Sequence, residues 1–121
     1  MSQVESASLV EVALPLKMQQ TFTYEVPPSL RGSAIPGMRA LVPLGNRSIT
    51  GYIVGVTTST PSAPLKPIHD LLDPEPLLDA HMLGLTRWAA DYYLTSWGLV
   101  IRASLPPGID RSTARDRKSV V

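Results

Sequence analysis

The segment Gln20-Thr21-Phe22-Thr23-Tyr24-Glu25-Val26 decides the fold that we expect for this chain. Its residues alternate, so that Phe22, Tyr24 and Val26 share one face of an extended segment and the threonines share the other. Alternation with a period of two, in aromatic and β-branched residues, is typical of a strand with one buried face. We therefore expect residues 21–26 to anchor a small β-barrel at one end and to present a recognition site at the other.

Similar alternation on both sides of this segment predicts further strands. In the longest run, Gly51 and Gly55 indicate the bends or bulges that a sheet needs in order to curl into a barrel. Prolines bound several of the runs, and proline ends a strand because it cannot donate a hydrogen bond to the ladder. The four additional strands are expected at residues 8–14, 37–43, 49–57 and, around Ile68 and Leu71, 65–73.

Helical periodicity begins after the last predicted strand. Asp79 is a typical N-cap, since its carboxylate accepts hydrogen bonds from the free amides at a helix start. Apolar residues at Met82, Leu85, Ala89 and Tyr92 predict an amphipathic helix over residues 81–94. Ser96 is the expected cap of a second helix over 97–105. Strands first and helices after indicate an α+β fold, a small β-barrel of about five to six strands followed by two C-terminal helices.

Length and charge limit the classes of partner. The 121 residues suit one domain, which we expect over 1–109, followed by a basic tail at 110–121 that is disordered or a linker. The formal net charge is +1, so the chain is not a general polyanion binder. Cations exceed anions in residues 1–66 and 106–121, whereas anions exceed cations between them. Contacts with phosphates are therefore expected in the first half or the tail, unless the segregation is solvated surface charge.

Several enzyme classes are excluded by what the sequence lacks. It has no cysteine, which excludes disulfides, thiolate metal sites and cysteine nucleophiles. It has no P-loop, no nucleophile elbow and no paired-histidine zinc motif. Asp70, Asp73 and Glu75 lie in a proline-bounded connector, where we interpret them as solvated surface charge. No apolar run approaches the roughly 18 residues of a membrane span, and no signal peptide is recognisable. We expect a cytoplasmic binding module without cofactors.

A series of short segments follows in a specific order along the chain. The segments are Val12-Ala13-Leu14-Pro15, Thr21-Phe22-Thr23-Tyr24, Pro36-Gly37-Met38-Arg39-Ala40-Leu41-Val42-Pro43-Leu44-Gly45, Gly51-Tyr52-Ile53-Val54-Gly55-Val56, Leu65-Lys66-Pro67-Ile68, Leu72-Asp73-Pro74-Glu75-Pro76-Leu77-Leu78, Arg87-Trp88-Ala89-Ala90-Asp91-Tyr92-Tyr93, Gly98 and Leu105-Pro106-Pro107-Gly108. No single segment is diagnostic, but their joint order resembles the N-terminal 3′ DNA-binding domain of the PriA replication-restart family. The resemblance covers roughly residues 9 to 109.

The resemblance implies a DNA-binding role. In that family the domain recognises the 3′-hydroxyl end of the leading strand at stalled replication forks, and the family's full-length protein is a helicase. The helicase and zinc-binding domains, which use ATP and zinc, are not in these residues. We therefore expect a non-catalytic, monomeric domain of a bacterial, nucleoid-associated protein. Its expected partners are DNA forks, single-stranded DNA-binding protein (SSB), primosome proteins and its own helicase domains. The alternative is a small-barrel module that binds SSB or primosome proteins rather than DNA.

The same resemblance implies a DNA 3′-end site at Phe22, Thr23, Tyr24, Gly45 and Lys66. The aromatic residues would lie beside the terminal base, the turn glycine would let a nucleotide approach the main chain, and the lysine would neutralise a phosphate. Core packing is the alternative for both aromatic residues and is preferred for Tyr24. Gly45 could equally be a plain hairpin glycine, and Lys66 could equally be an exposed strand lysine.

The sequence departs from the family at Thr23, where the family usually has an aspartate. A hydroxyl accepts hydrogen bonds without charge, and charge-assisted bonds are roughly twice as strong. We therefore expect the contact with the terminal hydroxyl to be weaker here or to come from another group. Thr23→Asp is expected to increase the preference for a 3′-hydroxyl over a 3′-phosphate.

Two further features are interpreted from position. Arg47, beside the turn glycine, is a possible phosphate contact. In the helix, Trp88 and Tyr92 are expected to be buried, with Asp91 paired to Arg87 one turn away. The alternative for this helix signature is a docking face for the helicase domains.

Overall fold

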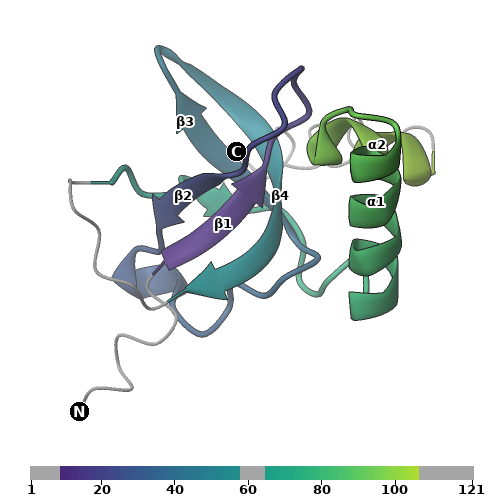
Figure 1. The fold of residues 1–121 in the computed structure, drawn as a ribbon. Helices are drawn as coiled ribbons and strands as arrows, with labels where there is room; N and C mark the ends of the chain where they lie inside the picture. Colours follow the sequence, from purple (N-terminus) through teal and green to yellow (C-terminus); the bar gives the residue numbers. More distant parts are fainter. Residues whose placement is uncertain (1–8, 58–64, 107–121) are drawn as a thin grey trace.

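The computed structural model describes residues 9–57 and 65–106 as a curled sheet with two helices on one side (Figure 1). The predicted tail at 110–121 lies outside these ranges. Within them, no helix is long and apolar enough to cross a membrane. The elements are β1 (Leu9–Ala13), β2 (Phe22–Glu25), a 3₁₀ turn (Pro28–Leu30), β3 (Arg39–Leu44), β4 (Arg47–Thr57), β5 (Asp70–Leu71), α1 (Ala80–Tyr92) and α2 (Trp97–Ser104).

The strands form one sheet in the order β2-β1-β4-β3-β5, and every neighbouring pair is antiparallel. β3 and β4 form a hairpin in which Leu44 pairs with Arg47, so the turn is Gly45-Asn46. Gly45 has a φ of +62°, a conformation that a residue without a Cβ adopts freely. The α+β class and the order of strands before helices are confirmed.

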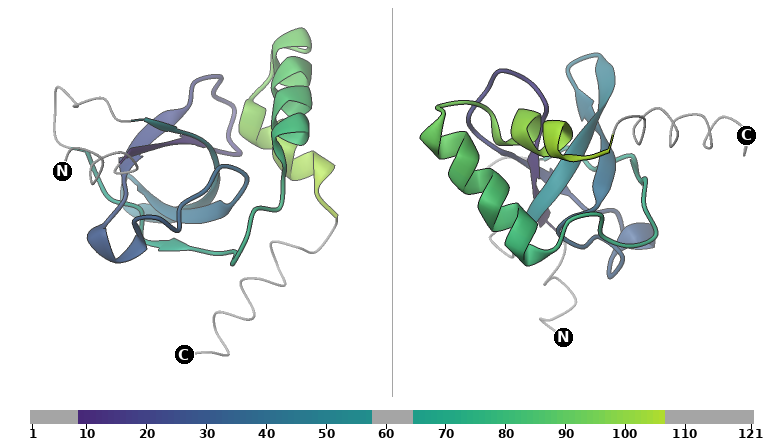
Figure 2. Two further views of the ribbon diagram at one scale, coloured as in Figure 1. Left: turned by 90° about the horizontal axis from the view of Figure 1, so that it is seen from below. Right: turned by 90° about the vertical axis from the view of Figure 1, so that its right-hand side faces the viewer.

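The expected barrel is an open sheet with its two edges linked at one point. The amide of Glu25 in β2 donates to the carbonyl of Lys66 at 2.9 Å, and the amide of Ile68 donates back to Glu25 at 2.9 Å. His69 then donates to Leu41 in β3 at 2.7 Å. The segment around Ile68 thus bridges β2 and β3, and Figure 2 shows the sheet curling round its core. The predicted fifth strand shrinks to the two residues of β5, because this bridging segment serves both edges.

The inner face of the sheet carries the main core. Alternate residues of each strand point inward, as their period-two pattern requires. They are buried together with loop residues, in a cluster comprising Val10, Val12, Leu14, Tyr24, Val26, Ala34, Met38, Ala40, Val42, Ile53 and Ile68. A second cluster beneath the helices comprises Ala13, Tyr52, Leu78 and Ile101. The sheet therefore has a core on one face and a helical cover over part of the other.

A β-bulge interrupts the pairing of β1 with β4. Glu11 pairs with Gly55, whereas the next residue, Val12, pairs with Ile53, so Val54 is the extra residue on β4. A bulge of this kind bends the strand and changes the direction of nearby side chains. The prediction of an irregularity at Gly55 is confirmed, and the bulge lies beside Glu11.

The helix caps are as predicted. The Asp79 carboxylate accepts from the amide of Met82 at 2.9 Å, and the Ser96 hydroxyl oxygen accepts from the amide of Leu99 at 3.2 Å. The Ser96 hydroxyl also donates to the carbonyl of Leu14 at 3.1 Å. The cap thus fixes the start of α2 against the chain that leaves β1.

The predicted inner face of α1 is wrong. Leu85, Trp88 and Tyr92 are 49%, 59% and 66% exposed. Thr86 and Ala90 are the buried residues of the helix. The helix is rotated because its small residues let it approach α2 closely, whereas its bulky aromatic residues would hold the two helices apart.

The interpretation of Asp73 as solvated surface charge is also wrong. Its carboxylate accepts from Arg39 through the main-chain amide at 2.9 Å, through Nε at 3.2 Å and through Nη2 at 2.7 Å. Both side chains are nearly fully buried. This ion pair joins the connector before α1 to the start of β3.

Candidate functional site

The predicted site residues on β2 lie on both faces of an edge strand. Phe22 and Tyr24 point to the inner face with the core, whereas Thr23 points to the outer face. Phe22 and Thr23 are each only partly buried. The structure therefore leaves Phe22 and Thr23 accessible but does not bring them to the same side of the strand.

Tyr24 lies in the core and not on the surface. It is 5% exposed, and its hydroxyl donates to the carbonyl of Pro43 at 2.8 Å. Burial raises the pKa of the phenol above its ordinary value. A direct contact between Tyr24 and DNA is therefore corrected to a structural role. This hydrogen bond links β2 across the interior to β3, next to the hairpin turn.

The remaining predicted residues are exposed on neighbouring segments. Gly45 and Arg47 lie at the tip of the β3–β4 hairpin, the longest projection of the sheet in Figure 1. Lys66 lies beside Glu25, whose amide bonds to its carbonyl. The structure thus places Lys66 next to β2 and links the hairpin to β2 through Tyr24 and Pro43.

The polar centre of the outer face is Glu11, which was not among the site residues predicted from the sequence. Thr21 donates to its Oε1 at 2.9 Å, and Thr23 donates to its Oε2 at 2.7 Å. Glu11 and Thr23 are direct cross-strand partners in the β1–β2 pair. A carboxylate therefore stands beside Thr23, although the chain has no acidic residue at position 23 itself.

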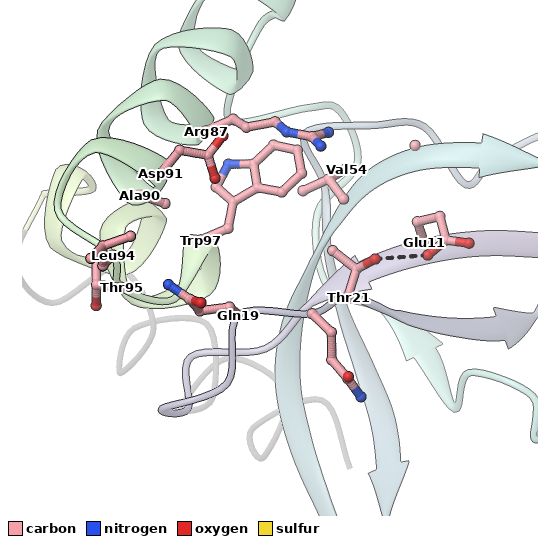
Figure 3. Close-up of a pocket in the computed structure, with 12 residues that line it drawn as sticks. Glu11, Gln19, Thr21, Val54, Arg87, Ala90, Asp91, Leu94, Thr95 and Trp97 are labelled. Atoms are coloured by element: carbon pink, nitrogen blue, oxygen red, sulfur yellow. Dashed lines mark hydrogen bonds between the residues drawn. The ribbon is translucent and has the colours of Figure 1, made fainter.

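A cleft of about 760 Å³ opens beside this carboxylate, between the sheet and the helices. Figure 3 shows Glu11 and Thr21 on the sheet side, facing Trp97, Arg87 and Asp91 on the helix side. The lining residues are Glu11, Val54 and Gly55 from the sheet, Gln19, Gln20 and Thr21 from the loop before β2, and Arg87, Ala90, Asp91, Leu94, Thr95 and Trp97 from the helical part. The cleft thus lies between the bulge of β4, the loop before β2 and the helical part.

The indole of Trp97 forms a fixed wall of the cleft. Its Nε1 donates to the hydroxyl of Thr86 at 2.9 Å, and the guanidinium of Arg87 lies 5.1 Å from its ring centroid. Arg87 was expected to pair with Asp91, but its cationic group instead lies over an aromatic face. These contacts hold an aromatic side chain and a cation together at the helix side.

Two signals in the sequence point to this site in retrospect. Glu11 is a charged residue in the centre of the apolar strand Leu9–Ala13, and Trp97 follows directly after the Ser96 cap. Neither signal gives the cross-strand pairing that places Glu11 beside Thr23. The bulge in the pairing of β1 with β4, beside the Glu11–Gly55 pair, is likewise a property of the folded sheet.

A second feature is an exposed aromatic surface on α1 and the two residues that follow it, formed by Leu85, Trp88, Tyr92, Tyr93 and Leu94. The rings of Trp88 and Tyr92 stack with centroids 5.1 Å apart, and Tyr93 meets Tyr92 edge-on at 4.9 Å. We refer to these five residues as the aromatic face. It is distinct from the cleft, which shares only Leu94 with it.

Comparison with known proteins gives a consistent result. Three bacterial relatives are each named replication restart protein PriA. The chain is 29% identical over 106 residues to that of Treponema pallidum, 34% over 110 residues to that of Synechocystis, and 34% over 100 residues to that of Haemophilus influenzae. These alignments cover 83%, 88% and 81% of this chain but only 16%, 13% and 13% of the relatives. The family model described as the 3′DNA-binding domain (3′BD) of PriA matches residues 11–106, so this chain belongs to the PriA 3′DNA-binding domain family.

Proposed function

We propose that this chain binds DNA at a free 3′-hydroxyl end and so places a replication-restart helicase at stalled forks. Family membership over residues 11–106 is the observation that carries this proposal. The chain itself supplies binding and no catalysis. ATP and zinc belong to other domains of the longer protein, and the setting is the bacterial cytoplasm at the nucleoid.

The geometry of β2 supports the proposal. β2 is an edge strand with Phe22 and Thr23 accessible on its two faces. Lys66 lies beside the strand, and Gly45 and Arg47 stand exposed at the neighbouring hairpin. A cation beside β2 suits the end of a DNA strand, because cations hold phosphates while the terminal hydroxyl needs a neutral or acceptor-rich site.

The test is a titration of the chain with forked DNA whose leading-strand end carries a 3′-hydroxyl, a 3′-phosphate or a blocking group. The proposal expects saturable binding at low salt, with the highest affinity for the 3′-hydroxyl. Equal affinity for all three ends would reduce the function to general DNA binding. Absence of binding to every fork at low salt would contradict the proposal.

A second function, docking to another protein, is favoured by the aromatic face. A helix with apolar side chains on both its inner and outer sides is normally buried on both sides. Trp and Tyr are also the residues that most often dominate protein interfaces. The relatives carry long additional sequence, since this chain spans 13–16% of their length. We propose that the helicase domains of the longer protein cover the aromatic face, with SSB or a primosome protein as the alternative occupant.

Trp88→Ser with Tyr92→Ser tests this docking. In the longer protein, the double variant should expose α1 to limited proteolysis and leave DNA binding by the isolated domain unchanged. Arg102→Ser, on the exposed side of α2, is the control. Unchanged proteolysis in the longer protein, together with lost binding to SSB, would show that SSB and not the helicase domains binds the aromatic face. Unchanged behaviour in both assays would contradict docking.

A further inference from the structure

The Glu11 carboxylate is held in one orientation and has acceptor capacity to spare. Both of its oxygens accept a threonine proton, from Thr21 at 2.9 Å and from Thr23 at 2.7 Å. A carboxylate offers about four acceptor positions, so roughly two remain for a ligand. Each threonine hydroxyl has one proton, and both protons are already donated to Glu11. Because the Glu11 carboxylate is charged and the Thr23 hydroxyl is not, Glu11 is the stronger acceptor for a hydroxyl of a ligand.

Space beside Glu11 comes from Gly55, the residue next to the bulge. The residue paired with Glu11 on the β4 side is Gly55, which has no side chain. A Cβ built at Gly55 meets nothing within 4 Å. The carboxylate thus has two threonine hydroxyls on its β2 side and open space on its β4 side, and this open space belongs to the cleft.

The walls of the cleft suit a flat, neutral ring with polar edges. Val54 and Trp97 provide apolar contact, and Asp91 and Gln19 provide hydrogen-bonding groups in the lining. A volume of about 760 Å³ lies within the usual range for small-ligand sites. A nucleoside combines such a ring with a sugar hydroxyl that donates to a carboxylate.

Charge in the cleft selects against a terminal phosphate. Glu11 and Asp91 are both acidic, and the one cation among the lining residues that the structure describes, Arg87, lies over the Trp97 ring. A phosphate brought beside Glu11 would meet a like charge at close range, which costs free energy. A free hydroxyl would instead gain a charge-assisted hydrogen bond.

We infer that the cleft holds the last nucleoside of the DNA strand and that Glu11 accepts the hydrogen bond from its 3′-hydroxyl. This inference rests on the proposed function and names the group that distinguishes the ends. It places the terminal sugar on the outer side of β2, beside Thr23. The inner-facing Phe22 then acts by holding β2 against the core.

The two tryptophans of the chain allow a direct test. In a Trp88→Phe background, Trp97 is the only tryptophan and reports on the cleft. Short oligothymidylates ending in a 3′-hydroxyl, a 3′-hydrogen or a 3′-phosphate are titrated while the tryptophan fluorescence is followed. The 3′-hydroxyl strand should quench Trp97 and bind most tightly.

Two variants in this background test separately the charge of Glu11 and the open space at Gly55. Glu11→Gln should lower the affinity for the 3′-hydroxyl strand about tenfold, as expected for loss of a charge-assisted hydrogen bond, and should leave the 3′-hydrogen strand unchanged. Gly55→Leu should fill the cleft and weaken the binding of all three strands while keeping the fold, because a Cβ at this position meets nothing within 4 Å. Glu75→Gln, an exposed carboxylate of the connector, is the control for net charge.

The outcomes distinguish the two proposals. In one outcome, Glu11→Gln and Gly55→Leu both keep the preference for the 3′-hydroxyl strand while the Trp97 fluorescence does not change on titration. This result overturns the assignment of the cleft and leaves the proposed function intact. Failure of the parent chain to bind any strand overturns both. Loss of the preference for the 3′-hydroxyl strand in Glu11→Gln but not in the Glu75→Gln control, with a native circular dichroism spectrum, supports the assignment of the cleft to the last nucleoside.

Discussion

At the scale of single residues, two glycines in the helical part have opposite environments. A Cβ at Gly98 would lie 2.1 Å from the carbonyl oxygen of Leu14, whereas a Cβ at Gly84 would meet nothing within 4 Å. Gly98→Ala must therefore push α2 away from the chain after β1. We expect it to lower the free energy of unfolding by about 1–3 kcal/mol.

Gly84→Ala is the matched control, because it makes the same chemical change at an open position of α1. It should raise the free energy of unfolding by about 0.5–1 kcal/mol, as the helix loses less backbone entropy on folding. Urea denaturation measures both variants. Equal effects of the two substitutions would show that the approach of α2 to Leu14 is not close.

Tyr24 gives a prediction that depends on pH. Burial disfavours the phenolate, so the pKa of Tyr24 is higher in the folded chain than in the unfolded chain. Its contribution to stability is complete below the unfolded pKa of about 10 and decreases as pH rises through the folded value.

Tyr24→Phe should therefore lower the free energy of unfolding at pH 8 by about 0.5–1.5 kcal/mol, through loss of the bond to Pro43. The difference between wild type and variant should shrink above pH 10. Urea denaturation from pH 8 to pH 11 measures it. A difference that stays constant over this range would contradict the assigned burial.

The site could be predicted from single residues only in part. The partial exposure of Thr23 follows from a half-buried strand pattern, and the structure agrees. The same pattern places Phe22 on the buried face and does not predict its partial exposure. The role of Glu11 does not follow, because it depends on which strands pair and in which register. The structure also adds a cost to Thr23→Asp, since the new carboxylate would face Glu11 directly across the strand pair.

At the scale of elements, the buried ion pair between Arg39 and Asp73 fixes the connector before α1. Arg39 is 2% exposed, so removal of Asp73 would leave a cation buried without this partner carboxylate. Asp73→Ala is expected to lower the free energy of unfolding by about 3–5 kcal/mol.

A double-mutant cycle tests the coupling. Arg39→Met combined with Asp73→Leu should lower the free energy of unfolding by less than the sum of the two single substitutions, because the double variant has no buried charge at this place. Chemical denaturation of the four proteins gives the interaction energy. Additive effects would mean that the two side chains do not stabilise each other.

Element boundaries and caps were largely predictable, whereas the orientation of α1 was not. Asp79 and Ser96 act locally, so their sequence context is sufficient. The choice between two apolar faces of α1 depends on what packs against it. The close approach of the helices selected Thr86 and Ala90 for the inside and left Trp88 and Tyr92 outside.

At the scale of the whole molecule, the open sheet reflects a connection that strand periodicity does not show. The segment at Lys66 and Ile68 bonds to β2 and then to β3, with one parallel bridge at Glu25 and Pro67. Alternation predicted a full strand here. The chain instead changes neighbours within a few residues, so a regular ladder cannot form.

The sparse positive charge of the molecule predicts a weak salt dependence of DNA binding. Arg47 and Lys66 are the proposed phosphate contacts, and each phosphate contact on single strands contributes about −0.7 to the slope of log K against log salt. A slope of about −1.4 is expected from these two contacts. Arg47→Gln should reduce its magnitude by about 0.7, whereas Arg102→Gln on α2 should not change it.

A slope several times steeper would show that many more cations bind phosphates than the proposal contains. A slope of zero would exclude phosphate contacts by Arg47 and Lys66. Fluorescence anisotropy of a labelled oligonucleotide over a range of salt concentrations gives this slope for the wild type, Arg47→Gln and Arg102→Gln.

The most direct measurement of the central claim is a map of amide chemical shifts during titration with a short 3′-hydroxyl oligonucleotide. We predict saturable shifts concentrated at Glu11, Thr21, Thr23 and Gly55, and much smaller shifts at the same amides with the 3′-phosphate strand. Shifts confined to the aromatic face of α1, or no saturable shifts with either strand, would contradict recognition of a DNA 3′ end by this domain.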